Sequence, residues 1–134
     1  MNPQQRLALE QQFVALRNLN RVNEAYQLAQ QHPDVFPASM LWPVKADLLS
    51  LNLQAALKQK DQLELQGKYQ QAAQLIDQNL LALRQALDQL NKNQNEYAPL
   101  FNDYLYTLRV RERMPELIAE YQKLSVSEKF QLQP

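Results

Sequence analysis

Residues 67–76 read Gly-Lys-Tyr-Gln-Gln-Ala-Ala-Gln-Leu-Ile and contain the only glycine of the chain. Glycine adopts the left-handed backbone conformation without steric cost and commonly follows the last residue of a helix. The apolar residues Tyr69, Ala73 and Ile76 then follow at spacings of four and three, which are helical spacings. The stretch therefore predicts that one helix ends near Gln66 and that another begins near Lys68.

The helix that follows Gly67 is predicted to continue to about Asn91, because apolar residues keep the same spacing as far as Leu90. Ala72 and Ala86 widen its apolar stripe, which is typical of a helix buried against two neighbours. Similar periodicity, with Asn2 as an N-cap and Pro3 in the first turn, predicts helices along the rest of the chain. The predicted helices cover about residues 2–20, 21–31, 44–66, 68–91, 96–109 and 113–124.

Residues 33–44 break this regularity with three prolines set among apolar and aromatic residues. The segment is too apolar for a flexible linker. Two readings stay open: either a short helix begins at Pro37, or an ordered loop packs its aromatic side chains inward.

An internal repeat is suggested by three short stretches that begin at Arg21, Lys68 and Arg113. Each has a basic residue, an apolar residue and, three positions after that, a second apolar residue, and each is predicted to open the second helix of a pair. Residues 67–76 resemble the second half of a tetratricopeptide repeat, although the spacing between the three stretches exceeds that family's period. We therefore expect an all-α, tetratricopeptide-like superhelix forming a single domain over residues 1–134. Its three helical pairs would span about residues 3–33, 44–91 and 96–124.

The composition excludes several classes of protein. The net charge is zero, with 14 basic and 14 acidic residues, so nothing favours nucleic acid or an anionic membrane as a partner. No apolar run is long enough to span a bilayer. A single glycine argues against phosphate-binding loops, which need several.

No catalytic or metal-binding constellation is apparent. His32 is the only histidine and precedes a proline at a predicted helix end, with no second metal-ligating residue nearby. Glu112, Glu116 and Glu120 share one helical face, but neighbouring basic residues favour a solvated charged surface over a cation site. We expect no enzymatic activity, no cofactor and no metal.

Aromatic and polar residues indicate a binding groove instead. Tyr106, with Asn102 and Asp103, is predicted to lie opposite the apolar stripe of its helix, and in stacked helical pairs the first helix lines the concave face. An aromatic ring beside carboxylate and amide groups suits sugars or peptides. An ordinary exposed tyrosine is the competing reading of Tyr106, and packing into the core is the competing reading of Trp42.

Two longer stretches, from Phe13 through the helix centred on Ala25 and from Leu75 to Leu124, are similar to one family. They resemble the periplasmic repeat region of the PgaA family of outer-membrane porins, which export the biofilm polysaccharide poly-β-1,6-N-acetylglucosamine (PNAG). The resemblance implies an excised periplasmic segment of an outer-membrane protein. Its partners would be the partly deacetylated PNAG polysaccharide and a periplasmic deacetylase.

Carboxylates could pair with the ammonium groups of the deacetylated polymer, and aromatic rings could stack on its sugars. The groove candidates are Glu10, Trp42, Asp47, Asn102, Asp103 and Tyr106. We expect a monomer that does not insert into the membrane. Two alternatives stay open: a tetratricopeptide-like adaptor that binds proteins in the cytoplasm or periplasm, and a coiled-coil oligomerisation module built on the seam from Tyr69 to Leu90.

Overall fold

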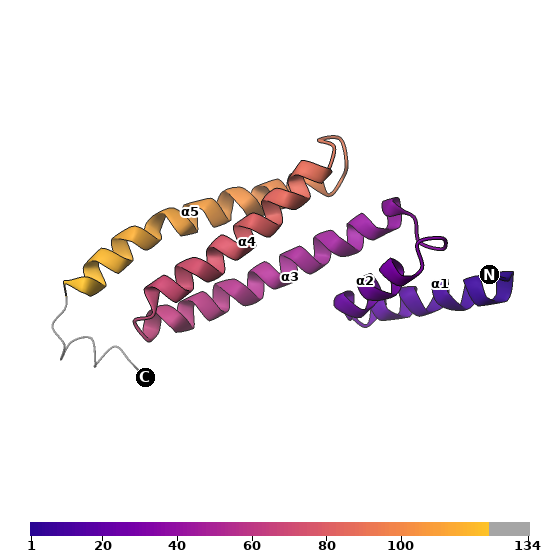
Figure 1. Ribbon diagram of the computed structural model, residues 1–134, viewed down its shortest axis with the longest axis horizontal. Helices are drawn as coiled ribbons and strands as arrows, with labels where there is room; N and C mark the ends of the chain where they lie inside the picture. The colour runs from indigo at the N-terminus through magenta and orange to yellow at the C-terminus, as the bar shows by residue number, and fades with distance from the viewer. Residues whose placement is uncertain (124–134) are drawn as a thin grey trace. The chain divides into compact units, whose positions relative to one another are not determined.

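The computed structural model describes residues 1–123, and within them the chain is all-helical (Figure 1). The chain divides into two compact units, Met1–Leu49 and a second that begins at Ser50. The boundary between the units falls inside α3. The helices are α1 (Pro3–Asn18), α2 (Val22–Gln31), α3 (Ala38–Leu65), α4 (Tyr69–Gln89) and α5 (Tyr97–Gln122).

The start of α1 forms as the sequence predicts. The Asn2 side chain accepts a hydrogen bond of 2.8 Å from the backbone N–H of Gln5, and the Gln5 side chain accepts one of 3.3 Å from the backbone N–H of Asn2. Pro3 occupies the first helical position, where its missing N–H has no partner to lose. This reciprocal capping box satisfies two of the backbone donors that a helix start leaves free.

The first unit has its own apolar core between α1, α2, the loop after α2 and the first turns of α3. Phe13 and Phe36 are the fully buried aromatic residues of this core, with ring centroids 4.9 Å apart and planes tilted by 38°. Phe36 is only 1% exposed. Seven residues of the unit are fully buried in this core: Phe13, Val22, Ala25, Ala29, Val35, Phe36 and Val44.

The proline-rich segment contains both of the structures that the sequence left open, an ordered loop and a helix that begins near Pro37. The carbonyl of His32 accepts hydrogen bonds of 3.0 Å from the N–H groups of Val35 and Phe36, forming an ordered loop that packs both side chains inward. A helix then begins directly after Pro37 and continues as α3. The predicted start of this helix at Val44 is therefore wrong by six residues, because the helix runs through Pro43 and does not begin after it.

The turn after α1 depends on an asparagine in the left-handed conformation. Asn20 has a φ of 60°, the only positive φ of a non-glycine residue among residues 1–123. The N–H of Arg21 reaches back to the carbonyl of Leu16 at 2.8 Å, as in a Schellman motif. Asparagine tolerates this conformation better than most residues, since its short polar side chain bonds locally.

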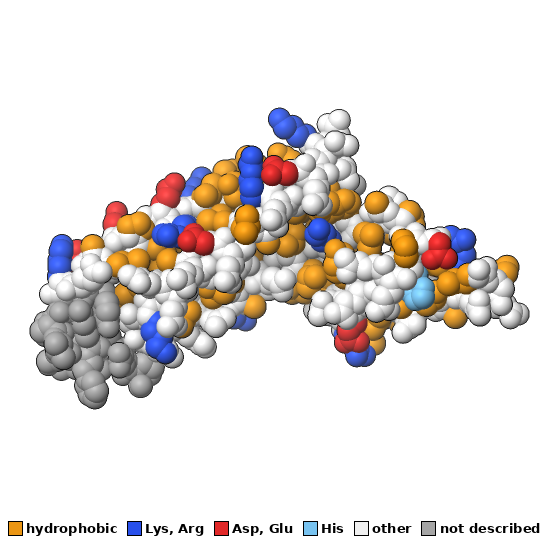
Figure 2. Space-filling model, in the orientation of Figure 1, with side chains coloured by type: hydrophobic (Ala, Val, Ile, Leu, Met, Phe, Trp, Pro, Cys, Tyr) orange, Lys and Arg blue, Asp and Glu red, His pale blue; other side chains and the backbone are white. Residues whose placement is uncertain are grey.

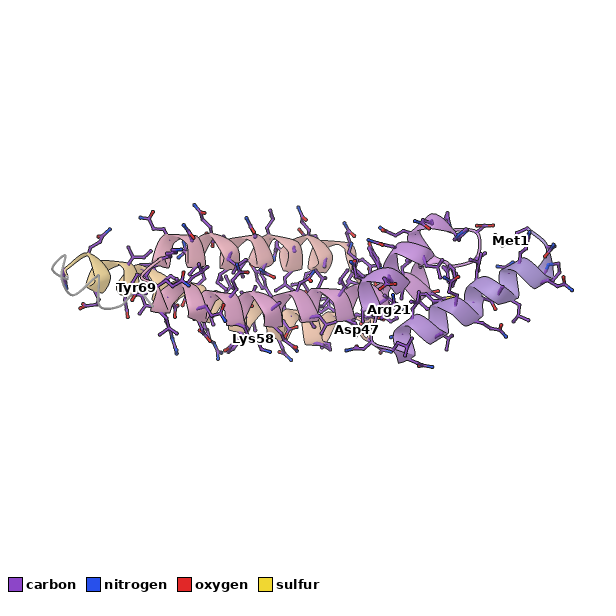
Figure 3. The ribbon with its side chains drawn as sticks, turned by 90° about the horizontal axis from the view of Figure 1, so that it is seen from below. Met1, Arg21, Asp47, Lys58 and Tyr69 are labelled. Carbon is purple, nitrogen blue, oxygen red and sulfur yellow. The ribbon has the colours of Figure 1, made fainter. Side chains whose placement is uncertain are left out.

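The turn after α3 repeats this geometry with glycine. Gly67 has a φ of 74°, and the N–H of Lys68 donates to the carbonyl of Leu63 at 2.8 Å. The next residue in each turn, Arg21 or Lys68, caps the following helix with a φ of −91°. Figure 3 labels Tyr69 beside the second turn. The first two predicted repeat stretches therefore do open helices through equivalent turns.

Replacing Gly67 with alanine should destabilise the second unit by about 1–2 kcal/mol, the cost of a left-handed residue that carries a Cβ. Urea denaturation followed by circular dichroism measures this change. Gly67→Asn is the matched control and should lose less, because asparagine already occupies the equivalent position after α1. Equal losses in both variants would contradict the equivalence of the two turns.

The second unit is organised around α4, which is buried along a wide stripe as predicted. Leu63 of α3 packs against a small cluster made by Ala72, Ala73 and Met114. The small alanines let helices approach closely, because interaxial distance depends on the side chains at the contact. An ion pair of 2.7 Å between Arg111 Nε and Asp77 Oδ1 also joins α5 to α4. The buried residues of α4 are Ala72, Ala73, Ile76, Leu83, Ala86 and Leu87.

One long helix, α5, stands where two short helices were predicted. It runs without a break from Tyr97 to Gln122 and contains Pro115 in its interior. The third repeat stretch, which starts at Arg113, therefore lies inside a helix and opens no new one. The described residues form two helical hairpins and a fifth helix, so the predicted third helical pair is wrong. The predicted helix end at residue 124 lies outside the described residues.

The buried face of α5 also differs from the predicted one. Leu100, Thr107 and Met114 are fully buried, at intervals of seven residues. Thr107 satisfies its hydroxyl by donating to the carbonyl of Asp103 at 2.6 Å. The apolar spacing within residues 96–109 predicts that Leu100, Phe101 and Leu105 face inward, but only Leu100 is buried, and Phe101 and Leu105 are each 38% exposed. The sequence pattern fails here because a threonine takes a core position while apolar side chains lie at its edge.

Replacing Pro115 with alanine should stabilise the protein by about 2 kcal/mol. An interior proline costs a helix about 3 kcal/mol relative to alanine, and part of this is offset by the smaller entropy of its unfolded chain. Urea denaturation measures the gain. A loss of stability would instead place Pro115 at the start of a separate helix, where proline is favourable.

Candidate functional site

A groove in the second unit is lined by side chains of α3 and α5. It has a volume of about 520 Å³. The two helices are also joined by a hydrogen bond of 3.1 Å, which Ser50 Oγ of α3 donates to Asp103 Oδ2 of α5. From Tyr106 to Glu120 the groove follows α5 for about 21 Å, given the helical rise of about 1.5 Å per residue. The lining residues are Lys60 and Glu64 of α3 with Tyr106, Val110, Arg113, Met114, Glu116, Leu117 and Glu120 of α5.

The groove has an aromatic end, an apolar middle and charged margins. Tyr106 is 55% exposed, so its ring is available to a ligand. Met114 is fully buried, while Leu117 remains 36% exposed. Three carboxylates and two basic groups line the groove, so its formal charge is slightly negative. On the face shown in Figure 2, basic and acidic side chains are interspersed without a large patch of either sign.

Lys60 is the most enclosed charged group of the groove. Its ammonium lies 3.0 Å from Asp61 Oδ1 and 3.0 Å from Glu64 Oε1, and its side chain is 14% exposed. Burial by itself lowers the pKa of Lys60, but the hydrogen bonds to Glu64 and Asp61 outweigh it and raise the pKa above its ordinary value of 10.5. Lys60 is therefore charged at neutral pH and holds Glu64 in place.

The raised pKa of Lys60 predicts a loss of stability at high pH. A group whose pKa is higher in the folded state stabilises the fold below its unfolded pKa, and this contribution disappears as the pH rises through the folded value. Stability should therefore fall above about pH 10.5, the ordinary value for this lysine. Urea denaturation of the wild type and of Lys60→Met, at pH values below and above 10.5, measures how the free energy of unfolding depends on pH. The expected result is a shallower decline in the variant, and parallel declines would contradict the assignment.

The three candidates predicted on α5 lie in the second unit, but only Tyr106 lines the groove. Asp103 is half-buried, and its carboxylate accepts the hydrogen bond from Ser50. Asn102 is exposed. Tyr106 therefore borders a groove, whereas Asp103 helps to join α3 to α5.

The other three candidates lie in the first unit. Glu10 lines a hollow of about 510 Å³ with five other residues, among them Phe13 and Met40, and lies 3.5 Å from Arg6 in an exposed ion pair. Asp47, labelled on α3 in Figure 3, pairs with Arg17 at 3.2 Å. Trp42 is half-buried, with the Lys45 ammonium 4.9 Å from the centroid of its ring. Trp42 and Asp47 do not line the hollow with Glu10.

The sequence did not reveal Lys60 and Glu64 as groove residues, although both lie on one helical face at a spacing of four. Such pairs are common on solvated helices, so the spacing alone carried no functional signal. Glu116 and Glu120 line the groove and Glu112 does not. Among residues 1–123 no cluster of three metal-ligating side chains is present. In the same part of the chain, no helix combines the length and apolarity needed to cross a bilayer.

Comparison with protein-family models, with curated proteins and with solved structures gives no match to this chain. The groove itself and the resemblance noted in the sequence are therefore the basis for proposing a function.

Proposed function

We propose that this chain is a non-enzymatic helical scaffold that binds an extended ligand in the groove between α3 and α5. The observation that carries this proposal is an exposed tyrosine at the end of an apolar groove with carboxylates along its margin. Aromatic rings supply contact area to sugars and cations, and polar groups fix the ligand's orientation. The groove is open along α5, which suits a polymer better than a small compact substrate.

The ligand that fits both the groove and the resemblance is partly deacetylated PNAG. Each deacetylated sugar carries an ammonium group, which can pair with Glu116 or Glu120. Glu120 already lies 3.2 Å from Lys123, but both side chains are more than 70% exposed, so this ion pair is weak and easily exchanged. Tyr106 can stack on a sugar ring or on its ammonium group. Binding would be weak per sugar, as a scaffold that passes a polymer along requires.

In this proposal the chain works in the periplasm as part of a tetratricopeptide-like repeat region of an outer-membrane exporter. It would guide the polymer during secretion of the biofilm matrix and dock the periplasmic deacetylase. The equivalent turns at Asn20 and Gly67 support the repeat character, since each repeat unit would begin its second helix in the same way.

Glucosamine oligomers should bind the wild-type chain more tightly than fully acetylated oligomers, and Tyr106→Ala should weaken the binding. Loss of a cation–π contact removes about 0.5–2 kcal/mol, which is roughly 2-fold to 30-fold in the dissociation constant. Isothermal titration calorimetry measures both effects. Tyr106→Phe keeps the ring and should retain most of the affinity.

Leu81→Ala is the matched control, because Leu81 is 59% exposed on α4 and does not line the groove. Its affinity should equal that of the wild type. If the affinity survives Tyr106→Ala unchanged, or if acetylated oligomers bind equally well, the groove does not recognise the deacetylated polymer.

The apolar middle of the groove favours a second candidate, a peptide-binding adaptor. Val110, Met114 and Leu117 form a floor that could receive an apolar side chain of a partner protein. Two results together would favour this adaptor. The wild-type chain would capture a protein from a periplasmic extract and Leu117→Asp would not, while the glucosamine polymer would not bind to the wild-type chain.

A further inference from the structure

The outer face of α1 is an unpartnered surface in the first unit. Leu7 and Val14 are each 54% exposed on it, about 100–120° around the helix from the buried Phe13 at 3.6 residues per turn. A shallow hollow of about 430 Å³ lies along this face. Figure 3 shows side chains projecting from the edge of α1 that faces away from α2. The hollow is lined by Leu7, Glu10, Gln11, Val14, Ala15 and Asn18.

This face repeats every seven residues. Leu7 and Val14 are the apolar members, seven residues apart, and Gln11 and Asn18 alternate with them at spacings of four and three. In the heptad of a two-stranded coiled coil, Leu7 and Val14 would take the d positions and Gln11 and Asn18 the a positions, so the stripe offers a short mixed seam whose polar members lower its stability. Small residues, Ala8 and Ala15, follow the apolar members on one flank.

The other flank carries two charges of opposite sign at equivalent positions of the repeat. Glu10 and Arg17 are seven residues apart and are both solvent-accessible, with side chains 45% and 39% exposed. If two copies of α1 pair in antiparallel fashion with Gln11 facing the partner's Val14, the same register brings Glu10 to the partner's Arg17. It also brings Ala8 to the partner's Ala15. A two-fold axis creates each of these contacts twice.

We propose that two copies of this chain associate weakly through α1, in an antiparallel pair fixed by Glu10 and the partner's Arg17. The charges are complementary in this orientation alone, because in a parallel pair Glu10 would face the partner's Ala15 and Arg17 would face no residue of the partner's α1. The intrachain ion pairs of Glu10 with Arg6 and of Arg17 with Asp47 do not prevent this pairing. Both are exposed contacts, of 3.5 Å and 3.2 Å, which exchange at little cost.

The size of the face sets the strength of the association. The stripe from Gln4 to Asn18 is about 21 Å long at the helical rise of about 1.5 Å per residue. Two such helices bury less than the roughly 1,200 Å² at which stable interfaces begin. The dimer should therefore be transient, with a dissociation constant of about 0.1–1 mM, and should weaken further as salt screens the paired charges.

Charge reversal tests the pairing directly. Glu10→Arg would place two arginines opposite each other at each contact, and Arg17→Glu would place two glutamates there, so each variant alone should dissociate at least tenfold more readily. A mixture of the two variants should associate again, because both contacts are then complementary. Sedimentation equilibrium at up to about 1 mM protein measures the dissociation constants of the wild type, of each variant and of the mixture. Glu112→Arg, an exposed charge reversal on α5, is the control and should leave the dimer unchanged.

Cysteine cross-linking tests the orientation, and the chain contains no cysteine of its own. Ala8→Cys mixed with Ala15→Cys should form an interchain disulfide, whereas Ala8→Cys alone should not. A parallel pair would give no cross-link with either sample, because the alanine flank of one copy would then face the charged flank of the other, and cysteines on opposite sides of the seam lie too far apart to bridge. A strictly monomeric chain at about 1 mM, or a dimer indifferent to both charge reversals, would overturn the proposal.

Discussion

Phe36→Ala is expected to lower the stability of the first unit by about 3–5 kcal/mol, which is the range for truncating a buried aromatic residue. Phe36 is 1% exposed and packs against the ring of Phe13, so its removal leaves a cavity and also ends an aromatic contact. Trp42 is the only tryptophan and lies in the first unit, so its fluorescence during urea denaturation reports this change. The loss would be a large fraction of the stability of a domain of this size.

The matched control is Leu19→Ala, because Leu19 lies in the same unit and is 66% exposed. Its effect should stay within about 0.5 kcal/mol. If Phe36→Ala proves equally mild, the proline-rich loop does not anchor the core of the first unit.

Met114→Ala should destabilise the second unit by about 2–5 kcal/mol. Met114 is fully buried against Ala72 and Ala73 of α4, where little can move to fill the space that its side chain leaves. Urea denaturation followed by circular dichroism measures the loss.

Leu117→Ala is the control for the register of α5. The sequence pattern predicts that Leu117 points inward, but the structure leaves it 36% exposed at the edge of the groove. Its truncation should cost less than half as much as that of Met114. The reverse order would restore the register predicted from the sequence.

Local chemistry made several features predictable. The N-cap at Asn2, the turn at Gly67 and the wide buried stripe of α4 each follow from residues close together in the chain, and all three are confirmed. The equivalence of the turns at Asn20 and Gly67 was predicted only as a repeat of side-chain types. The left-handed conformation of Asn20 adds a backbone feature that the composition of its neighbours did not indicate.

The predictions from the sequence are wrong or incomplete where prolines lie in helix interiors and where tertiary packing brings distant residues together. The sequence pattern predicts helix boundaries near Pro43 and Pro115, yet both residues lie inside helices. Packing of the long helices outweighs the free-energy cost of an interior proline. The groove could not be predicted in full, since Lys60 and Glu64 lie on a different helix from Tyr106 and only the fold brings them together. The contact of Asp103 with Ser50 of α3 could not be predicted either, because the two residues are 53 positions apart in the chain.

Binding of a deacetylated sugar polymer in the groove between α3 and α5 is the central proposal. The most direct measurement is a titration of glucosamine oligomers into isotopically labelled protein, followed by NMR chemical shifts of the backbone amides. We expect saturable shifts at Tyr106, Arg113, Glu116 and Glu120, with no saturable change around Leu81 on the exposed side of α4. Shifts confined to residues outside the groove, or none at millimolar oligomer, would contradict the proposal.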